Sequence, residues 1–132
     1  MIGIYVFLAG VSGLAMVALA AYGAHGGGPD GLPDAGLFQT AWQIHAVHTA
    51  VLVALGMCRR PNIWLYAAFW LMLGGTFFFS GSLYAVGLGK LAGGSIITPV
   101  GGVLLMAGWF ALAISGLYRL GYQSTTSRKK DD

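Results

Sequence analysis

The chain has 132 residues, of which 57% are hydrophobic and only 8% are charged. Soluble domains contain about 25% charged residues, so this composition predicts a membrane protein and excludes a nucleic-acid binder or an ordinary soluble enzyme. The single cysteine, Cys58, cannot form an intrachain disulfide, which excludes a disulfide-stabilised secreted scaffold. The lipid bilayer is therefore the first expected partner, and no nucleic-acid partner is expected.

The positions of the few charges divide the chain into four segments. No Asp, Glu, Lys or Arg occurs in residues 1–29, 35–58, 61–89 or 91–118. A membrane-crossing helix needs about 20 apolar residues, and each window is long enough to hold one. We expect an all-α membrane protein with four transmembrane helices in an up-down-up-down bundle, in a single domain over 1–120 with a polar tail over 121–132. The expected helices are 2–24, 37–57, 63–88 and 98–118.

The first segment is apolar throughout and ends in Tyr22-Gly23-Ala24-His25-Gly26. Within it, Ala18-Leu19-Ala20 resembles the cleavage site of a signal peptide, but no Lys or Arg precedes the segment, and its apolar run is longer than that of a signal peptide. We therefore expect it to be retained as a helix. The following loop, 26–34, is rich in Gly and Pro and cannot continue a helix.

The second segment is the least hydrophobic of the four. Its first half carries six polar side chains before an apolar run begins at Ala50, and these are Gln39, Thr40, Gln43, His45, His48 and Thr49. Arg59-Arg60-Pro61-Asn62 then ends the segment, because proline interrupts a helix and asparagine is a good N-cap for the next one.

The third and fourth segments carry the markers of membrane helices. Trp64, Tyr66 and Trp70 suit the headgroup interface, and Phe79-Ser80-Gly81-Ser82-Leu83-Tyr84 lies near the other end of the third segment. The fourth segment opens at Thr98-Pro99, where Thr can cap the helix and Pro is tolerated in its first turn.

The distribution of Lys and Arg predicts the orientation. With four crossings, the N-terminus, the 59–62 loop and the C-terminal tail share one side and hold six of the seven basic residues. The positive-inside rule therefore predicts a multi-pass protein of the bacterial inner membrane with both termini in the cytoplasm.

This topology places uncharged polar residues from all four helices in the outer half of the membrane. Polar groups that face hydrocarbon are costly, so we expect them to face the bundle or a wet cavity, and an outward-facing polar pocket is the default site. His48 and Ser80 have expected depths that would allow them to meet. The candidate pocket residues are His25, Gln43, His45, His48, Ser80, Ser82, Tyr84 and Thr98.

A purely structural role for these residues is the main alternative. Ser, Thr, Gln and neutral His in membrane helices commonly form interhelical hydrogen bonds without any ligand. In the second helix, Gln39 and Gln43 share one stripe with Ala46, Ala50 and Ala54, and His45 and His48 lie on nearly the opposite face. Both faces therefore need protein neighbours, which places this helix centrally or leaves one face to a partner or ligand.

Metal, haem and catalytic sites have weaker support. His45 and His48, three residues apart, would allow a shared metal with His25 as a third ligand, but no Cys, Asp or Glu lies at their depth. Haem ligation by His25 and His48 would require imidazoles at similar depths, and these two differ by about 15 Å. No catalytic constellation is recognisable, so we expect no metal, no cofactor and no enzymatic activity.

Four stretches spread over residues 1–120 resemble a known family. They are Ala21 to Gly26, Gln43 to Leu52, Phe79 to Tyr84, and Thr98 to Gly102 with Ala107-Gly108-Trp109. Together they resemble domain-of-unknown-function family 423, small four-helix proteins of the bacterial inner membrane related to eukaryotic transmembrane protein 256. The resemblance places His25 and His48 at the family's histidines, whereas His45 occupies a position that need not be histidine. It implies four helices and no assigned reaction.

Three functions remain open from the sequence. The leading expectation is a non-catalytic accessory or structural subunit that packs with other membrane proteins or self-associates as a homo-oligomer. The alternative is binding or transport of a small neutral or lipid-like molecule in the outer pocket. The third is haem, metal or quinone binding through His25 and His48.

Overall fold

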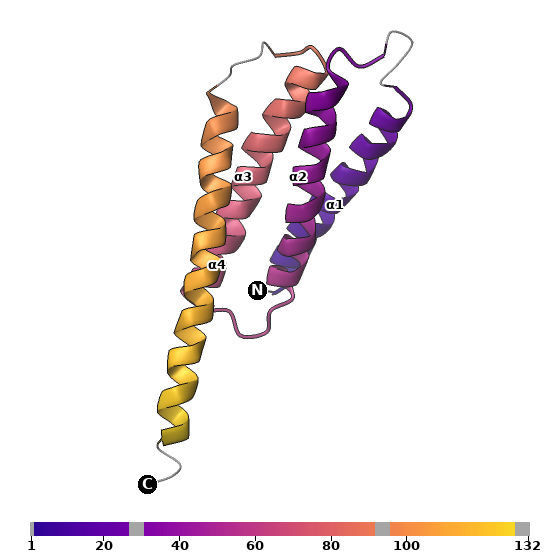
Figure 1. Ribbon diagram of the computed structural model, residues 1–132. Coiled ribbons are helices and arrows are strands. Elements are labelled where there is room, and N and C mark those ends of the chain that lie inside the picture. The colour runs from indigo at the N-terminus through magenta and orange to yellow at the C-terminus, as the bar shows by residue number, and fades with distance from the viewer. Residues whose placement is uncertain (1, 27–30, 92–95, 129–132) are drawn as a thin grey trace.

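The computed structural model describes residues 2–26, 31–91 and 96–128. They form four α-helices and contain no strand: α1 (Ile2–Ala24), α2 (Ala35–Gly56), α3 (Ile63–Gly87) and α4 (Ile97–Arg128). Consecutive helices run in opposite directions, and α1 begins at the end of the molecule toward which α4 descends (Figure 1). The expected all-helical architecture with four helices is confirmed.

Three of the helices are long and apolar enough to cross a membrane. The candidate spans are Gly3–Ala24 in α1, Ile63–Gly87 in α3 and Ile97–Leu120 in α4. The helix α2 is not among them, because its polar residues lower its hydropathy. The structure thus identifies three of the four expected spans.

The helix boundaries follow from local capping chemistry. The Asp34 carboxylate accepts a hydrogen bond from the Leu37 N–H at 2.9 Å, so α2 begins at Ala35, earlier than the expected residue 37. Asn62 caps α3 in the same way through the Leu65 N–H at 3.0 Å, as its sequence position suggests. The helix α4 continues to Arg128 rather than ending at 118, because no proline interrupts that stretch.

The helices pack side by side in chain order, with α2 and α3 in the middle. Among the described residues, helix backbones approach closely only between consecutive helices, and α1 and α4 lie on opposite flanks of the central pair (Figure 1). The closest contacts of α3 and α4 occur at glycines. A Cβ placed on Gly75 would lie only 2.8 Å from the backbone nitrogen of Leu105.

A polar layer separates two apolar clusters inside the molecule. Phe69 and Leu52 belong to the cluster nearer the α2–α3 loop, whereas Phe38 and Leu83 belong to the cluster nearer the opposite end. Buried polar side chains occupy intermediate positions along α2 and α3, and these are His45, His48, Thr49, Thr76 and Ser80. These five side chains therefore lie at mid-height, while buried Ser82 and Ser115 lie nearer the two ends.

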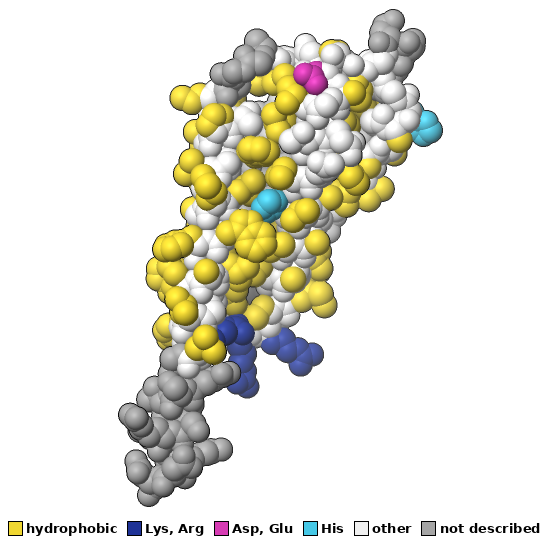
Figure 2. Space-filling model, in the orientation of Figure 1, with side chains coloured by type: hydrophobic (Ala, Val, Ile, Leu, Met, Phe, Trp, Pro, Cys, Tyr) yellow, Lys and Arg dark blue, Asp and Glu magenta, His cyan; other side chains and the backbone are white. Residues whose placement is uncertain are grey.

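The surface has the pattern of a membrane protein. Hydrophobic side chains cover most of the face in Figure 2, with basic side chains at the end where the α2–α3 loop lies and an acidic side chain at the other end. Large apolar residues of α1 are exposed, including Phe7, Leu14 and Val17. Because such a surface is unfavourable in water, lipid contact is the expected environment of these helices.

The contact between α3 and α4 can be tested with two adjacent glycines. Gly75→Ala should lower the free energy of unfolding by about 1–3 kcal/mol, because the added methyl group collides with α4. Gly74→Ala is the matched control, since a Cβ there meets nothing within 4 Å. Reversible denaturation in mixed micelles measures both, and equal stability of the two variants would contradict the described packing.

Candidate functional site

A chain of hydrogen-bonded side chains crosses the polar layer around His45. Its Nε2 atom lies 3.1 Å from the Ser12 hydroxyl, and Ser12 lies 2.8 Å from the Thr49 hydroxyl. The Tyr84 hydroxyl lies 3.4 Å from His45 Nδ1. A neutral imidazole protonated at Nε2 satisfies this chain, because it accepts from Tyr84 and donates to Ser12, whose hydroxyl then donates to Thr49.

His48 is held separately, on the side of α2 that faces α4. The Trp109 indole N–H donates to His48 Nε2 at 3.1 Å, so Nδ1 carries the proton and donates to the Ile44 carbonyl at 2.8 Å. Both ring nitrogens are thus engaged within the protein. Among the described residues, no group of three or more His, Cys, Asp or Glu side chains is arranged to hold a metal ion.

An open cavity of about 320 Å³ lies between α1 and α3, with His45 of α2 at its base. We call it the α1–α3 groove. Val11 and Phe77 line it and are 48% and 74% exposed, so it opens sideways through the apolar surface rather than toward either end of the helices. Its other lining residues are Leu8, Ser12, Ala15, Leu19, His45, Leu73, Thr76, Ser80, Gly81 and Tyr84.

The Ser80 hydroxyl is the unsatisfied group of this groove. Ser80 is only 1% exposed, and its oxygen has no hydrogen-bond partner. Its neighbour Thr76 instead donates to the Met72 carbonyl at 2.7 Å. Leaving a buried hydroxyl unpaired costs about 1–3 kcal/mol, so a hydrogen-bonding group that reached it by displacing the side chains that cover it would be stabilised there.

The candidate residues from the sequence fall into three groups. His45, Ser80 and Tyr84 line the α1–α3 groove together. Ser82 lies elsewhere, 2.6 Å from Thr98, where it joins α3 to α4, and His48 bonds Trp109. The side chains of Gln43 and His25 are exposed. Among the described residues, no hydrogen bond joins His48 to Ser80, so the structure does not support the expected contact between these two residues.

Four residues that belong to the polar layer or bond to it were not among the candidates: Ser12, Thr49, Thr76 and Trp109. Ser12 was detectable, because it is the one hydroxyl side chain in the middle of an otherwise apolar helix. Thr76 and Trp109 gave weaker signals, since threonine often bonds its own helix and tryptophan is common at membrane interfaces. Ser12 and Thr76 both line the groove, and Trp109 fixes His48.

Comparisons with known proteins identify a family and several relatives that this chain resembles. Residues 19–102 match the family model described as a protein of unknown function, DUF423. The chain is 42% identical over 115 residues to the UPF0382 inner membrane protein YgdD of Escherichia coli K12, covering 85% of this chain and 87% of that protein. It is 33% identical over 117 residues to a UPF0382 membrane protein of Staphylococcus epidermidis, covering 86% and 95%. No solved structure matches significantly.

Proposed function

We propose a binding function for this chain, which belongs to the DUF423 family and whose named relatives are membrane proteins. In this proposal the α1–α3 groove holds a neutral, lipid-like molecule that carries one hydrogen-bonding group. The observation that carries the proposal is the Ser80 hydroxyl, which is buried in the groove without a partner.

The shape and lining of the groove support a lipid-like ligand. Its volume of about 320 Å³ is at the lower end of the range for small-molecule sites, about 300–1,000 Å³. Leucine, valine, alanine and phenylalanine side chains supply six of its twelve lining residues, and no charged residue lines it. An apolar tail would therefore lie along α1 and extend past Phe77 into the bilayer, with the polar group at Ser80.

The surroundings of Ser80 favour binding over catalysis. A serine nucleophile requires a base within hydrogen-bond distance, and no described side chain hydrogen-bonds Ser80. The nearby imidazole of His45 is already engaged by Ser12 and Tyr84. The groove thus offers a hydrogen-bonding anchor and an apolar wall.

The proposal includes an orientation in the bacterial inner membrane. Arg59, Arg60 and Arg119 lie at one end of the molecule, and Arg119 reaches the loop that carries the other two. The positive-inside rule places this end in the cytoplasm, together with both termini. In this arrangement α2 crosses the membrane alongside α1 and α3, because its buried polar side chains are bonded to neighbouring helices.

Association with other membrane-protein subunits or with a second copy is a second candidate function. The exposed face of α2 favours such association, because Gln39 and Gln43 lie there on the same stripe as Ala50 and Ala54. Small residues allow close helix approach, and glutamine can hydrogen-bond across a helix interface. The exposed stripe therefore suits a partner helix, on a different face of the molecule from His45.

The binding proposal is tested by comparing two buried serines. Ser80→Ala should weaken binding of a long-chain alcohol by about threefold. This is the loss of affinity expected when one hydrogen bond of the strength usual between membrane helices is removed. It should not lower the stability of the empty protein, because the hydroxyl it removes is unpaired. A photoreactive long-chain alcohol, competed by the unlabelled alcohol in nanodiscs, measures the affinity.

Ser115→Ala is the matched control for this experiment. Ser115 is also 1% exposed, but it donates to Asn62 at 3.1 Å and does not line the groove. This variant should lose stability and keep the affinity for the alcohol. Gly81→Leu should block the groove, since a Cβ there meets nothing within 4 Å. Unchanged binding by both Ser80→Ala and Gly81→Leu would refute the proposal.

The orientation is tested with the single cysteine. Cys58 lies in the α2–α3 loop and is partly exposed. A membrane-impermeant maleimide should label it in inverted inner-membrane vesicles and not in intact spheroplasts. As a control, Leu91→Cys in a Cys58→Ser background places the thiol at the opposite end and should show the reverse pattern. Labelling of Cys58 in spheroplasts would overturn the orientation.

Association through the α2 stripe is tested by enlarging one of its small residues. Ala50→Leu should shift the protein toward monomers, because the larger side chain separates the two helices. Ala113→Leu, at an exposed position on α4, is the control and should leave the mass unchanged. Sedimentation in mild detergent measures the mass, and a monomeric wild-type protein recovered without any partner would rule out this candidate.

A further inference from the structure

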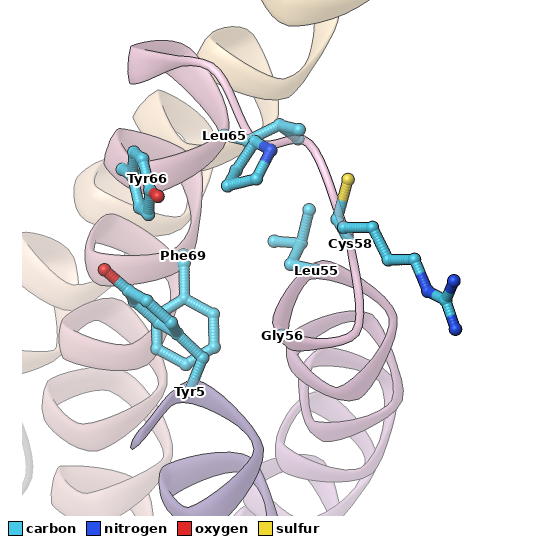
Figure 3. A pocket seen from close by; sticks show the side chains of 9 residues that line it. Tyr5, Leu55, Gly56, Cys58, Leu65, Tyr66 and Phe69 are labelled. Carbon is cyan, nitrogen blue, oxygen red and sulfur yellow. The ribbon is translucent and has the colours of Figure 1, made fainter. Parts of the chain in front are cut away.

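A second cavity lies at the basic end of the molecule, apart from the α1–α3 groove. It has a volume of about 200 Å³ and is formed by the start of α1, the end of α2, the following loop and the first turns of α3. In Figure 3, Tyr5, Phe69 and Tyr66 lie on one side of this cavity, and Leu55, Gly56 and Cys58 lie on the other. We call it the basic-end cavity.

The aromatic wall of this cavity is tightly built. The Tyr5 ring packs edge-on against Phe69 with centroids 4.7 Å apart, and it lies 5.6 Å from the Tyr66 ring. Gly56 allows this arrangement, because a Cβ there would lie 3.2 Å from the Tyr5 backbone. Tyrosines with an apolar ring and a polar hydroxyl suit the level of lipid headgroups.

The loop that closes the cavity is held in place by α4. The Arg119 guanidinium donates to the Arg60 carbonyl at 2.8 Å and to the Cys58 sulfur at 3.2 Å. Ser115 donates to Asn62, which caps α3. These bonds fix the backbone on both sides of Arg59, whose exposed side chain lines the cavity.

The charge of this end is uniformly positive among the described side chains. Arg59, Arg60 and Arg119 lie here, whereas the described acid, Asp34, caps α2 at the opposite end. Guanidinium groups bind phosphate well, and basic pockets at the cytoplasmic ends of membrane helices are suited to anionic lipid headgroups. The apolar walls formed by Leu55, Leu65 and Phe69 suit the glycerol backbone and the start of an acyl chain.

We infer that the basic-end cavity binds the headgroup of an anionic phospholipid, with the phosphate held by Arg59 on the loop side and the glycerol region against Tyr5 and Tyr66 on the opposite wall. The cavity is too small for a whole lipid, so the acyl chains continue along the exposed apolar surface. A free phosphate would use the same arginine but would gain nothing from the apolar walls. This site is independent of ligand binding at Ser80.

The experiment uses the full chain in nanodiscs that contain equal amounts of phosphatidylglycerol and phosphatidylcholine with identical acyl chains. Native mass spectrometry of the released protein counts the lipids it retains. The wild-type protein should prefer phosphatidylglycerol, and Arg59→Gln should reduce that preference about fivefold, the effect of one basic residue near an anionic surface. Tyr66→Phe, which keeps the ring, should reduce it to a lesser degree.

Lys90→Gln is the matched control, because it removes an exposed positive charge at the opposite end of the molecule. It should leave the lipid preference unchanged. Equal preference in the wild type, Arg59→Gln and Tyr66→Phe would overturn the inference. Displacement of the retained lipid by glycerol phosphate at equal concentration would also overturn it, since the site would then recognise a soluble anion.

Discussion

The buried polar side chains of α2 have hydrogen-bond partners on the neighbouring helices, and these bonds fix how those helices pack against α2. Inside a packed bundle, a buried polar group without a partner is costly. Each neighbouring helix supplies one partner: Ser12 from α1 and Tyr84 from α3 meet His45, and Trp109 from α4 meets His48. α2 and α3 thus form the centre of the molecule, with α1 and α4 on opposite flanks.

The same polar layer accounts for the candidate site. Between its two apolar clusters, α1 and α3 separate enough to leave the α1–α3 groove, and the bonds of His45 extend across its base. Ser80 lies in this layer without a partner, while Ser115, equally buried, has one. In the proposed function, the unpaired Ser80 hydroxyl beside this apolar opening is the anchor for a bound molecule.

The sequence predicted the elements well and their contacts poorly. Charge positions located all four helices, and Asn62 was recognised as the cap of α3. The rotation of each helix was harder to predict, because α1 and α3 are apolar all round and have no marked polar face. Depth alone suggested that His48 would meet Ser80, but the rotation of α2 turns His48 toward Trp109. Which helices of similar composition pack together depends on the shapes of their side-chain surfaces, and composition alone does not predict these shapes.

We expect the Ser80 hydroxyl to anchor the polar group of a molecule that enters from the bilayer. The most direct measurement is a set of intermolecular nuclear Overhauser effects between a long-chain alcohol and the protein in bicelles of perdeuterated lipid. Effects should join the protons next to the alcohol hydroxyl to the Ser80 methylene group, and the alcohol chain to Phe77. Effects of equal strength at exposed positions such as Leu14 and Phe110, with none at Ser80, would contradict it.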